Sequence, residues 1–280
     1  MYHNLPSGIL GDVKLLNGSE LADYIKERQA RQVRALRQAH HVYPKLAIVQ
    51  TVDNPVIDAY VALKKRYGAD ILVDVDAHKV AQADLLQTIE QLNADQHVHG
   101  IIVQLPLADE SSTQNAVDSV LPAKDVDGLG VNAILDPATP MAINWLVAGY
   151  NINLIGKKVA IIGQGRLVGA PLARIWRESG YDITIFDKDQ GDLATLPDYD
   201  VIVTATGAPG LINSDHVKIG AVVIDAGTAA EHGKIVGDIT DDVRERDDVT
   251  ITPKKGGVGP LTVTALFDNV IRAAEATSKH

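Results

Sequence analysis

The sequence contains no cysteine, and this absence excludes several kinds of chemistry at once. Without thiols the chain has no disulfide bond, no thiolate nucleophile and no thiolate metal site. Nine histidines are present, but neither of the two close pairs, His40 with His41 and His97 with His99, has a carboxylate at a ligand spacing on a shared helix face. We therefore assign the histidines structural or solvent-facing roles and predict no metal site.

Basic charge is also scarce. The chain has 26 basic and 36 acidic side chains, for a net charge of −10. Nucleic acids are bound through clustered basic side chains, and the nearest such segment, residues 26–37, mixes its lysines and arginines with glutamate and glutamine as a solvated helix face does. No apolar run reaches about 18 residues, and residues 1–7 lack the pattern of a leader peptide. We expect a cytoplasmic protein that binds neither nucleic acid nor membrane.

At 280 residues and 46% hydrophobic content, the chain is long enough for two α/β domains with separate cores. In the first half, strand and helix patterns alternate. Ser19 is a candidate cap for a first helix that reaches about His41, and Asn54-Pro55 marks the turn into a second helix. The remaining predicted elements are strands at 45–51, 71–75 and 100–106 and a helix at about 82–93.

The second half begins with an apolar strand from Lys158 that ends in a glycine-rich turn. Gly163, Gly165 and Gly169 are spaced so that a backbone can approach a pyrophosphate at a helix N-terminus. The next strand, 181–186, ends at Asp187, 24 residues after Gly163, where an acidic side chain can bind an adenosine ribose 2′-hydroxyl. A plain βα turn and a solvated loop aspartate are the alternatives. Strands at 200–206 and 221–225 follow, and the alternation over 156–270 predicts a parallel sheet covered on both faces.

Five further motifs occur in a fixed order along nearly the whole chain. They are Tyr60-Val-Ala-Leu-Lys64, Val103-Gln-Leu-Pro-Leu107, Lys124-Asp-Val-Asp-Gly128, Ala138-Thr-Pro140 and Gly256-Gly-Val-Gly-Pro-Leu-Thr-Val263. Together they resemble the bifunctional methylenetetrahydrofolate dehydrogenase/cyclohydrolase (FolD) family. A Tyr-x-x-x-Lys pair also occurs in short-chain dehydrogenases, but there it follows the nucleotide turn, whereas here it precedes that turn by about 100 residues.

The resemblance implies a two-lobed α/β enzyme with a folate cleft between the lobes. Residues 1–139, completed by a C-terminal helix at 262–280, would form the catalytic, folate-binding lobe, and residues 140–261 a Rossmann-like, doubly wound NAD(P)-binding domain. In this family the oxidised cofactor takes a hydride from 5,10-methylenetetrahydrofolate, and water then opens the methenyl product to 10-formyltetrahydrofolate. A homodimer and a place in one-carbon metabolism and purine biosynthesis are further implications.

The residues matching the family's catalytic positions also suit the chemistry. Lys64 can donate a proton and, if its pKa is depressed, accept one near neutral pH. The resemblance assigns Tyr60 to orient the ammonium, Gln104 to act with the lysine in hydrolysis, and Asp127 to bind the pterin's amino-pyrimidine edge. Their plain alternatives are a surface helix contact, a loop cap and a turn that bonds its own backbone. The predicted folate-binding set is Tyr60, Gln104, Leu105, Pro106, Asp127, Gly257 and Pro260, with Pro260 opening the final helix at 261–277.

The expected cofactor is NAD or NADP, and the cofactor turn departs from the family pattern of Gly-Arg-Ser. An aspartate at position 187 would repel a 2′-phosphate at about 5 Å by roughly 3 kcal/mol at an effective dielectric near 20, so we predict NAD over NADP. Arg166 and Lys188 favour NADP instead. The predicted cofactor-binding residues are Gly163, Gln164, Gly165, Arg166, Val168, Gly169, Asp187, Lys188, Thr206, Gly207, Gly227 and Gly257.

Two other interpretations stay open at this point. The altered turn is compatible with a non-catalytic paralogue that binds folate or nucleotide, although such a protein would have little use for Lys64. The second interpretation is a family member that has only one of the two activities.

Overall fold

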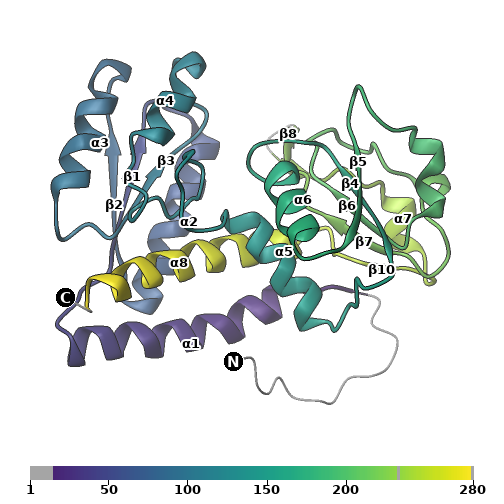
Figure 1. The fold of residues 1–280 in the computed structure, drawn as a ribbon, viewed down its shortest axis with the longest axis horizontal. Coiled ribbons are helices and arrows are strands. Elements are labelled where there is room, and N and C mark those ends of the chain that lie inside the picture. The colour runs from purple at the N-terminus through teal and green to yellow at the C-terminus, as the bar shows by residue number, and fades with distance from the viewer. Residues whose placement is uncertain (1–14, 232–233, 279–280) are drawn as a thin grey trace. The chain divides into compact units, whose positions relative to one another are not determined.

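A computed structural model describes residues 15–231 and 234–278 of the chain (Figure 1). These residues form two compact units, one made of residues 15–22 and 139–262 and the other of 23–138 and 263–278. The unit boundaries therefore fall inside the first and the last helix. Residues 15–22 group here with the second half of the chain, although the sequence analysis placed them in the first lobe. Residues 1–14 and 279–280 of that predicted lobe lie outside the described residues.

The unit made of 23–138 and 263–278, called the three-stranded unit below, is built on a parallel sheet in the order β2-β1-β3. The strands are β1 (Lys45–Gln50), β2 (Asp74–Lys79) and β3 (Gly100–Val103). Its helices are most of α1 (Gly18–Ala39), α2 (Pro55–Ile71), α3 (Leu85–Ala94), α4 (Thr113–Asp118) and most of α8 (Val258–Thr277), with 3₁₀ turns η1 (Gln82–Asp84) and η2 (Glu110–Ser112).

The central strand β1 is buried on both faces. Ala47 and Val49 pack with Leu85 and Ile89 of α3 in one apolar cluster. The neighbouring residues Leu46 and Ile48 are also fully buried. A parallel sheet whose central strand is apolar on both sides needs helices on both faces.

Two predicted element boundaries in the first half are wrong. Asn17, and not Ser19, caps α1, because its Oδ1 accepts the N–H groups of Ser19 at 3.1 Å and Glu20 at 3.4 Å. The strand predicted at 71–75 begins at Asp74 as β2. Helix α2 takes up Ile71 as its last residue, and its left-handed cap at Leu72, where φ is 64°, precedes the strand.

The unit made of 15–22 and 139–262, called the five-stranded unit below, contains a parallel sheet in the order β10-β7-β6-β4-β5. The strands are β4 (Lys158–Ile162), β5 (Asp182–Phe186), β6 (Val201–Thr204), β7 (Val222–Asp225) and β10 (Thr250–Ile251), beside an antiparallel pair, β8 (Ala229–Glu231) and β9 (Lys234–Val236). Its helices are α5 (Ala138–Gly149), α6 (Gly169–Glu178) and α7 (Asp241–Glu245), with η3 (Leu193–Asp198) and η4 (Ser214–His216).

The strand order reverses between β4 and β6, which makes this the switch point of a doubly wound sheet. Ligands of such sheets bind at the carboxyl ends of the strands on either side of the switch. Both faces of β4 are buried, since Val159, Ala160, Ile161 and Ile162 are at most 2% exposed. The predicted covering of the sheet on both faces is confirmed.

The final helix begins earlier than the sequence indicated. Helix α8 starts at Val258, so Pro260 is its third residue and does not precede its first turn. Proline is tolerated there because the first N–H groups of a helix have no partner within the helix.

Candidate active site

Lys64 and Gln104 are brought together in the three-stranded unit. Lys64 lies on α2, and its Nζ donates a hydrogen bond of 2.9 Å to Oε1 of Gln104, the residue that follows β3. The Gln104 backbone N–H donates to the carbonyl of Val49 on β1 at 2.8 Å, and its side-chain Nε2 donates to the Leu105 carbonyl at 3.1 Å. The amide is thus held with its oxygen toward the lysine, at the carboxyl end of the sheet.

The electrostatic setting of Lys64 favours proton transfer. Burial lowers the pKa of Lys64, and the nearby Asp127 carboxylate opposes this shift. Burial raises the pKa of Asp127 to about 6, an effect that Lys64 opposes and Asp125 increases. An amine and a carboxyl group whose pKa values both move toward neutrality suit general acid–base work near pH 7.

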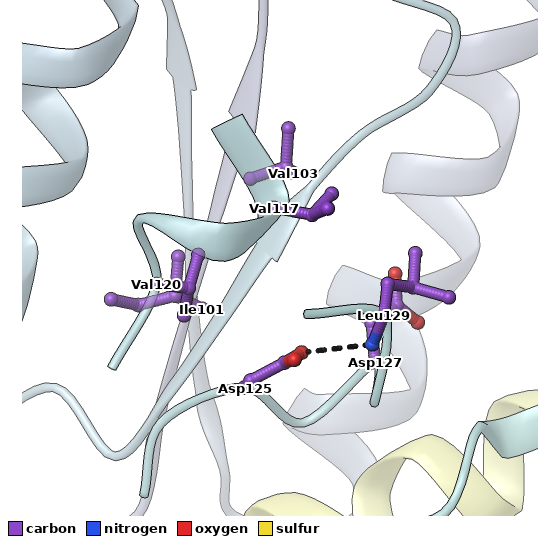
Figure 2. Close-up of a pocket in the computed structure, with 7 residues that line it drawn as sticks. All are labelled: Ile101, Val103, Val117, Val120, Asp125, Asp127 and Leu129. Carbon is purple, nitrogen blue, oxygen red and sulfur yellow. Dashed lines mark hydrogen bonds between the residues drawn. The ribbon is translucent and has the colours of Figure 1, made fainter. Parts of the chain in front are cut away.

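Asp125, the other carboxylate of the motif, shapes the turn that carries Asp127. It is buried, and its two oxygens accept the N–H groups of Gly128 at 2.9 Å and Gly130 at 2.8 Å. Figure 2 shows the Asp125 carboxylate aimed at the backbone nitrogen of Leu129, and both residues line a small pocket. The other lining residues are Ile101, Val103, Val117, Val120 and Asp127. These bonds give Asp125 a structural role in the turn.

Of the remaining residues predicted for folate, Tyr60, Leu105 and Pro106 lie in the three-stranded unit, whereas Gly257 and Pro260 lie in the five-stranded unit. Tyr60 is one turn before Lys64 on α2 and half-buried, and burial raises the pKa of its phenol, which stays neutral at physiological pH. The peptide bond between Leu105 and Pro106 is cis. Pro260 lies at the start of α8.

The predicted nucleotide turn joins β4 to α6 in the five-stranded unit. Gly163 has φ +96°, and a β-carbon there would lie 2.7 Å from the carbonyl oxygen of Ala205. A β-carbon on Gly169 would lie 1.8 Å from the carbonyl oxygen of Gly163. These two glycines are therefore required by close packing within the chain. Gly165 faces open space, with nothing within 4 Å of a built β-carbon.

The turn at the end of β5 holds Asp187 in place. Its N–H donates to the carbonyl of Gln190 at 2.7 Å, and the Gln190 N–H donates back at 3.2 Å. Its carboxylate accepts the N–H of Lys188, and both side chains are exposed. Because β5 pairs directly with β4, Asp187 lies at the same edge of the sheet as Gly163, whose N–H donates to the Phe186 carbonyl at 2.7 Å.

The other predicted cofactor residues lie on loops of this unit. Gln164, Gly165 and Arg166 are exposed in the β4–α6 turn, Val168 directly precedes α6, Thr206 and Gly207 are exposed after β6, and Gly227 is buried after β7. Gly257 is also buried. A β-carbon built on Gly18 would lie 1.9 Å from the carbonyl oxygen of Gly257. The paired glycines at 256 and 257 thus allow close packing against the start of α1, a reason that the sequence did not reveal.

Comparison with known proteins explains why these two clusters occur in one chain. Residues 16–127 match the family described as Tetrahydrofolate dehydrogenase/cyclohydrolase, catalytic domain, and residues 137–278 match its NAD(P)-binding domain. The Bifunctional protein FolD of Staphylococcus saprophyticus is 37% identical over 93% of this chain and 96% of its own length.

The chain belongs to the tetrahydrofolate dehydrogenase/cyclohydrolase family.

Solved FolD structures have the same fold over nearly their whole length. The Campylobacter jejuni enzyme is 32% identical with a TM-score of 0.88, covering 94% of this chain and 99% of that one. The Trypanosoma brucei dehydrogenase-cyclohydrolase, solved with NADP cofactor and inhibitor, is 27% identical with a TM-score of 0.89, covering 97% and 100%. The resemblance inferred from the five motifs is confirmed, and so is the two-domain α/β fold.

The sequence analysis missed a buried polar cluster in the NAD(P)-binding part of this family member. Asp225 ends β7, and its carboxylate accepts hydrogen bonds from Arg244 of α7 and from the backbone N–H of Asp238 at 3.1 Å. Asp238 is fully buried. The one available signal was the position of Asp225, which closes a buried strand two residues before Gly227, much as Asp187 closes β5.

The described residues contain no group of three or more histidine and acidic side chains placed to hold a metal ion. Buried His99 instead accepts the N–H of Lys45 through Nδ1 at 3.3 Å. None of the helices in residues 15–231 and 234–278 combines the length and the apolar character of a bilayer-spanning segment.

Proposed function

We propose that this chain oxidises 5,10-methylenetetrahydrofolate with a nicotinamide cofactor and then hydrolyses the methenyl product to 10-formyltetrahydrofolate. The observation that carries the proposal is the hydrogen bond of 2.9 Å between Lys64 and Gln104, beside an aspartate whose pKa is raised to about 6. Family membership supports the choice of substrate, and the glycines of the β4–α6 turn support the proposed position of the cofactor.

In the hydrolytic step, Lys64 and Gln104 act on the water and on the ring nitrogen. Water adds to the methenyl carbon and loses a proton to the neutral form of Lys64, whose depressed pKa makes that form available. Lys64 then returns the proton to the ring nitrogen as the bond between that nitrogen and the former methenyl carbon breaks, and the second water proton leaves to solvent as the added oxygen becomes the formyl carbonyl. Gln104, whose oxygen is fixed toward the ammonium, orients Lys64 through both transfers.

In the same proposal Asp127 binds the pterin, and Tyr60 packs on it. A carboxylate accepts hydrogen bonds from both N–H groups of an amino-pyrimidine edge, and a neutral phenol ring offers a flat apolar surface. Leu105, Pro106, Gly257 and Pro260 complete the proposed folate set.

The nicotinamide cofactor supplies the hydride acceptor, and the residues of the β4–α6 turn would hold its phosphates. Gly163 and Gly169 keep the turn compact, and the positive end of the α6 helix dipole favours an anion there. Arg166, Val168, Thr206, Gly207 and Gly227 would line the rest of the site.

We favour NAD over NADP because exposed Asp187 directly follows β5, where a 2′-phosphate would meet its charge. Lys188 lies beside it and weakens this preference.

A single assay tests the proposed function: formation of the methenyl product, followed by absorbance, with NAD and NADP in separate reactions. We expect turnover with both and a higher catalytic efficiency with NAD. A preference for NADP of roughly tenfold or more, about 1.4 kcal/mol, would overturn the cofactor assignment. The absence of turnover with either cofactor would favour a non-catalytic paralogue, and methenyl accumulation without hydrolysis a member with one activity.

Three further expectations rest on the family resemblance alone. They are a homodimer, a role in one-carbon metabolism, and a supply of one-carbon units to purine biosynthesis, while the proposed cytoplasmic location rests on the sequence patterns described above. We also propose functional lobes of residues 1–139 with 262–280 for folate and 140–261 for the cofactor.

A further inference from the structure

Two buried carboxylates lie behind the cofactor loops of the five-stranded unit. Asp225 is neutralised by a buried ion pair with Arg244, and it also accepts the Thr204 hydroxyl at 3.2 Å and the Gly227 N–H at 3.1 Å. Asp238 is fully buried, and its pKa is raised by that burial and, to a lesser degree, by Asp225. A buried carboxylate is costly, so each retained one needs a structural or functional reason.

The contacts of Asp238 lead directly to the loop after β6. Its Oδ2 accepts the backbone N–H of Thr206 at 2.8 Å. A β-carbon on Gly163 would lie 3.1 Å from Cγ2 of Thr206 and 2.7 Å from the carbonyl oxygen of Ala205. The loop that Asp238 holds is therefore the loop on which the nucleotide turn rests.

Asp238 also lies against the loop after β7. A β-carbon built on Gly227 would lie 2.1 Å from Oδ1 of Asp238, so only glycine leaves room for the carboxylate. One carboxylate thus fixes the spacing of the loops after β6 and β7, at the carboxyl edge where a doubly wound sheet binds its ligand.

We propose that Asp238 is a positioning residue for the nicotinamide cofactor, acting through the Thr206 N–H to hold the loop of residues 205–208 against Gly163. The inference rests on the proposed function, since it takes this edge of the sheet as the cofactor site. Asp238 need not touch the cofactor, because it sets the position of backbone that does.

The charge of Asp238 is not what this role needs. An asparagine side chain of the same shape keeps an oxygen that accepts from Thr206. Oδ1 has no hydrogen-bond partner within the described part of the chain, so an amide there displaces no donor. Alanine, in contrast, removes the acceptor of the Thr206 N–H and the carboxylate that holds this loop in place.

The experiment measures cofactor binding by calorimetry, with NAD and NADP separately, on wild type, Asp238→Ala and Asp238→Asn. Asp238→Ala should raise the Kd of the preferred cofactor by roughly tenfold or more, and Asp238→Asn by less than about threefold. Hydrolysis of added methenyl substrate, for which Lys64 and Gln104 lie in the other unit, should stay within about twofold of wild type in both variants.

Asp200→Ala is the matched control for general loss of stability. Asp200 accepts the N–H of Lys158 at 2.9 Å and pairs with Lys218, but at the amino end of the strands. The Asp200→Ala substitution should lower Tm without raising the cofactor Kd by more than about twofold. An equal rise in Kd for Asp200→Ala and Asp238→Ala would overturn the proposal, because the effect would then be one of stability.

Gly227→Ala decides the matter if Asp238→Ala does not fold. Its methyl group displaces the Asp238 carboxylate without removing it, and we expect the same rise in Kd of roughly tenfold. A Kd within about twofold of wild type in a folded variant of either kind would refute the positioning role. If wild type itself bound neither cofactor, the proposed function would fail first, which separates the two outcomes.

Discussion

The ammonium of Lys64 donates its hydrogen bond to the side-chain oxygen of Gln104 across 40 residues of sequence, at a distance of 2.9 Å. The bond joins the middle of a helix to the end of a strand, and it fixes the lysine where burial depresses its pKa. Lys64→Met should therefore abolish hydrolysis of added methenyl substrate. The exposed neighbour Lys65 offers the control, since Lys65→Met should change the rate by less than about twofold. Residual hydrolysis near the wild-type rate in Lys64→Met would show that another group moves the proton.

The raised pKa of Asp127 predicts a pH-dependent effect on stability. Its value is 3.8 for an ordinary aspartate and about 6 in the folded chain. The folded state binds this proton more tightly, so the stabilising contribution is full below the lower pKa and is lost as pH rises through about 6. Asp127→Asn, which stays neutral, should raise Tm by a few degrees at about pH 8 and the gain should vanish at acidic pH.

Asp125→Asn provides the comparison for that experiment. Both oxygens of Asp125 accept backbone N–H groups, from Gly128 and Gly130, and an amide keeps only one acceptor. This variant should lower Tm at the same pH. Thermal unfolding of both variants across the pH range would contradict the assignment if Asp127→Asn were the less stable one at about pH 8.

Cofactor choice should respond to the turn after β5. Asp187→Ser removes the charge opposing a 2′-phosphate and should raise the catalytic efficiency with NADP, relative to NAD, by roughly tenfold or more. Asp189→Ser changes an exposed aspartate two residues further along the same turn and should alter that ratio by less than about threefold. Equal shifts in the two variants would indicate a general charge effect at this surface.

Substitutions at two glycines of the nucleotide turn should distinguish a glycine needed for packing within the protein from a glycine needed for approach of the cofactor. Gly169→Ala places a methyl group 1.8 Å from the Gly163 carbonyl oxygen and should lower Tm markedly. Gly165→Ala meets no protein atom within 4 Å, so Tm should be kept while the cofactor Kd rises. Calorimetry and thermal unfolding on both variants test this, and an unchanged Kd in Gly165→Ala would remove Gly165 from the proposed site.

The buried ion pair of Arg244 with Asp225 should be a major determinant of stability. Their side chains are 12% and 5% exposed, so Arg244→Met leaves an uncompensated buried carboxylate and should cost about 3–5 kcal/mol. The exposed pair of Arg174 and Glu178 on α6 is the contrast, and Arg174→Met should cost less than about 1 kcal/mol. Denaturant unfolding measures both, and equal losses would argue against a buried pair.

The sequence predicted the elements whose signal is local, and it failed where distant residues decide. The β4 strand and the turn after it were predictable because a buried apolar run ends in glycines that a tight turn requires. The beginning of β2 could not be predicted in the same way. Helix α2 and its cap take up the first apolar residues of the predicted strand, because packing against the rest of the unit decides between helix and strand there.

The candidate site shows the same division. Lys64, Gln104 and Asp127 were identified only through motif order, since nothing in their separate sequence neighbourhoods shows that the chain brings them together. Asp238 was missed because its partners, Thr206 and Gly227, lie on other loops. From sequence alone, a charged residue in a loop is predicted to be exposed to solvent, and only the folded structure shows that Asp238 is buried.

The positions of the unit boundaries within α1 and α8 have a consequence for how such a chain can be rearranged. The polypeptide passes between the units three times, after residues 22, 138 and 262. A truncation at 138 would remove Asn269, whose amide donates to the carbonyls of Val126 and Asp136 at 2.9 Å each. Recombination at a single point in the gene therefore cannot replace the five-stranded unit and leave the three-stranded unit complete.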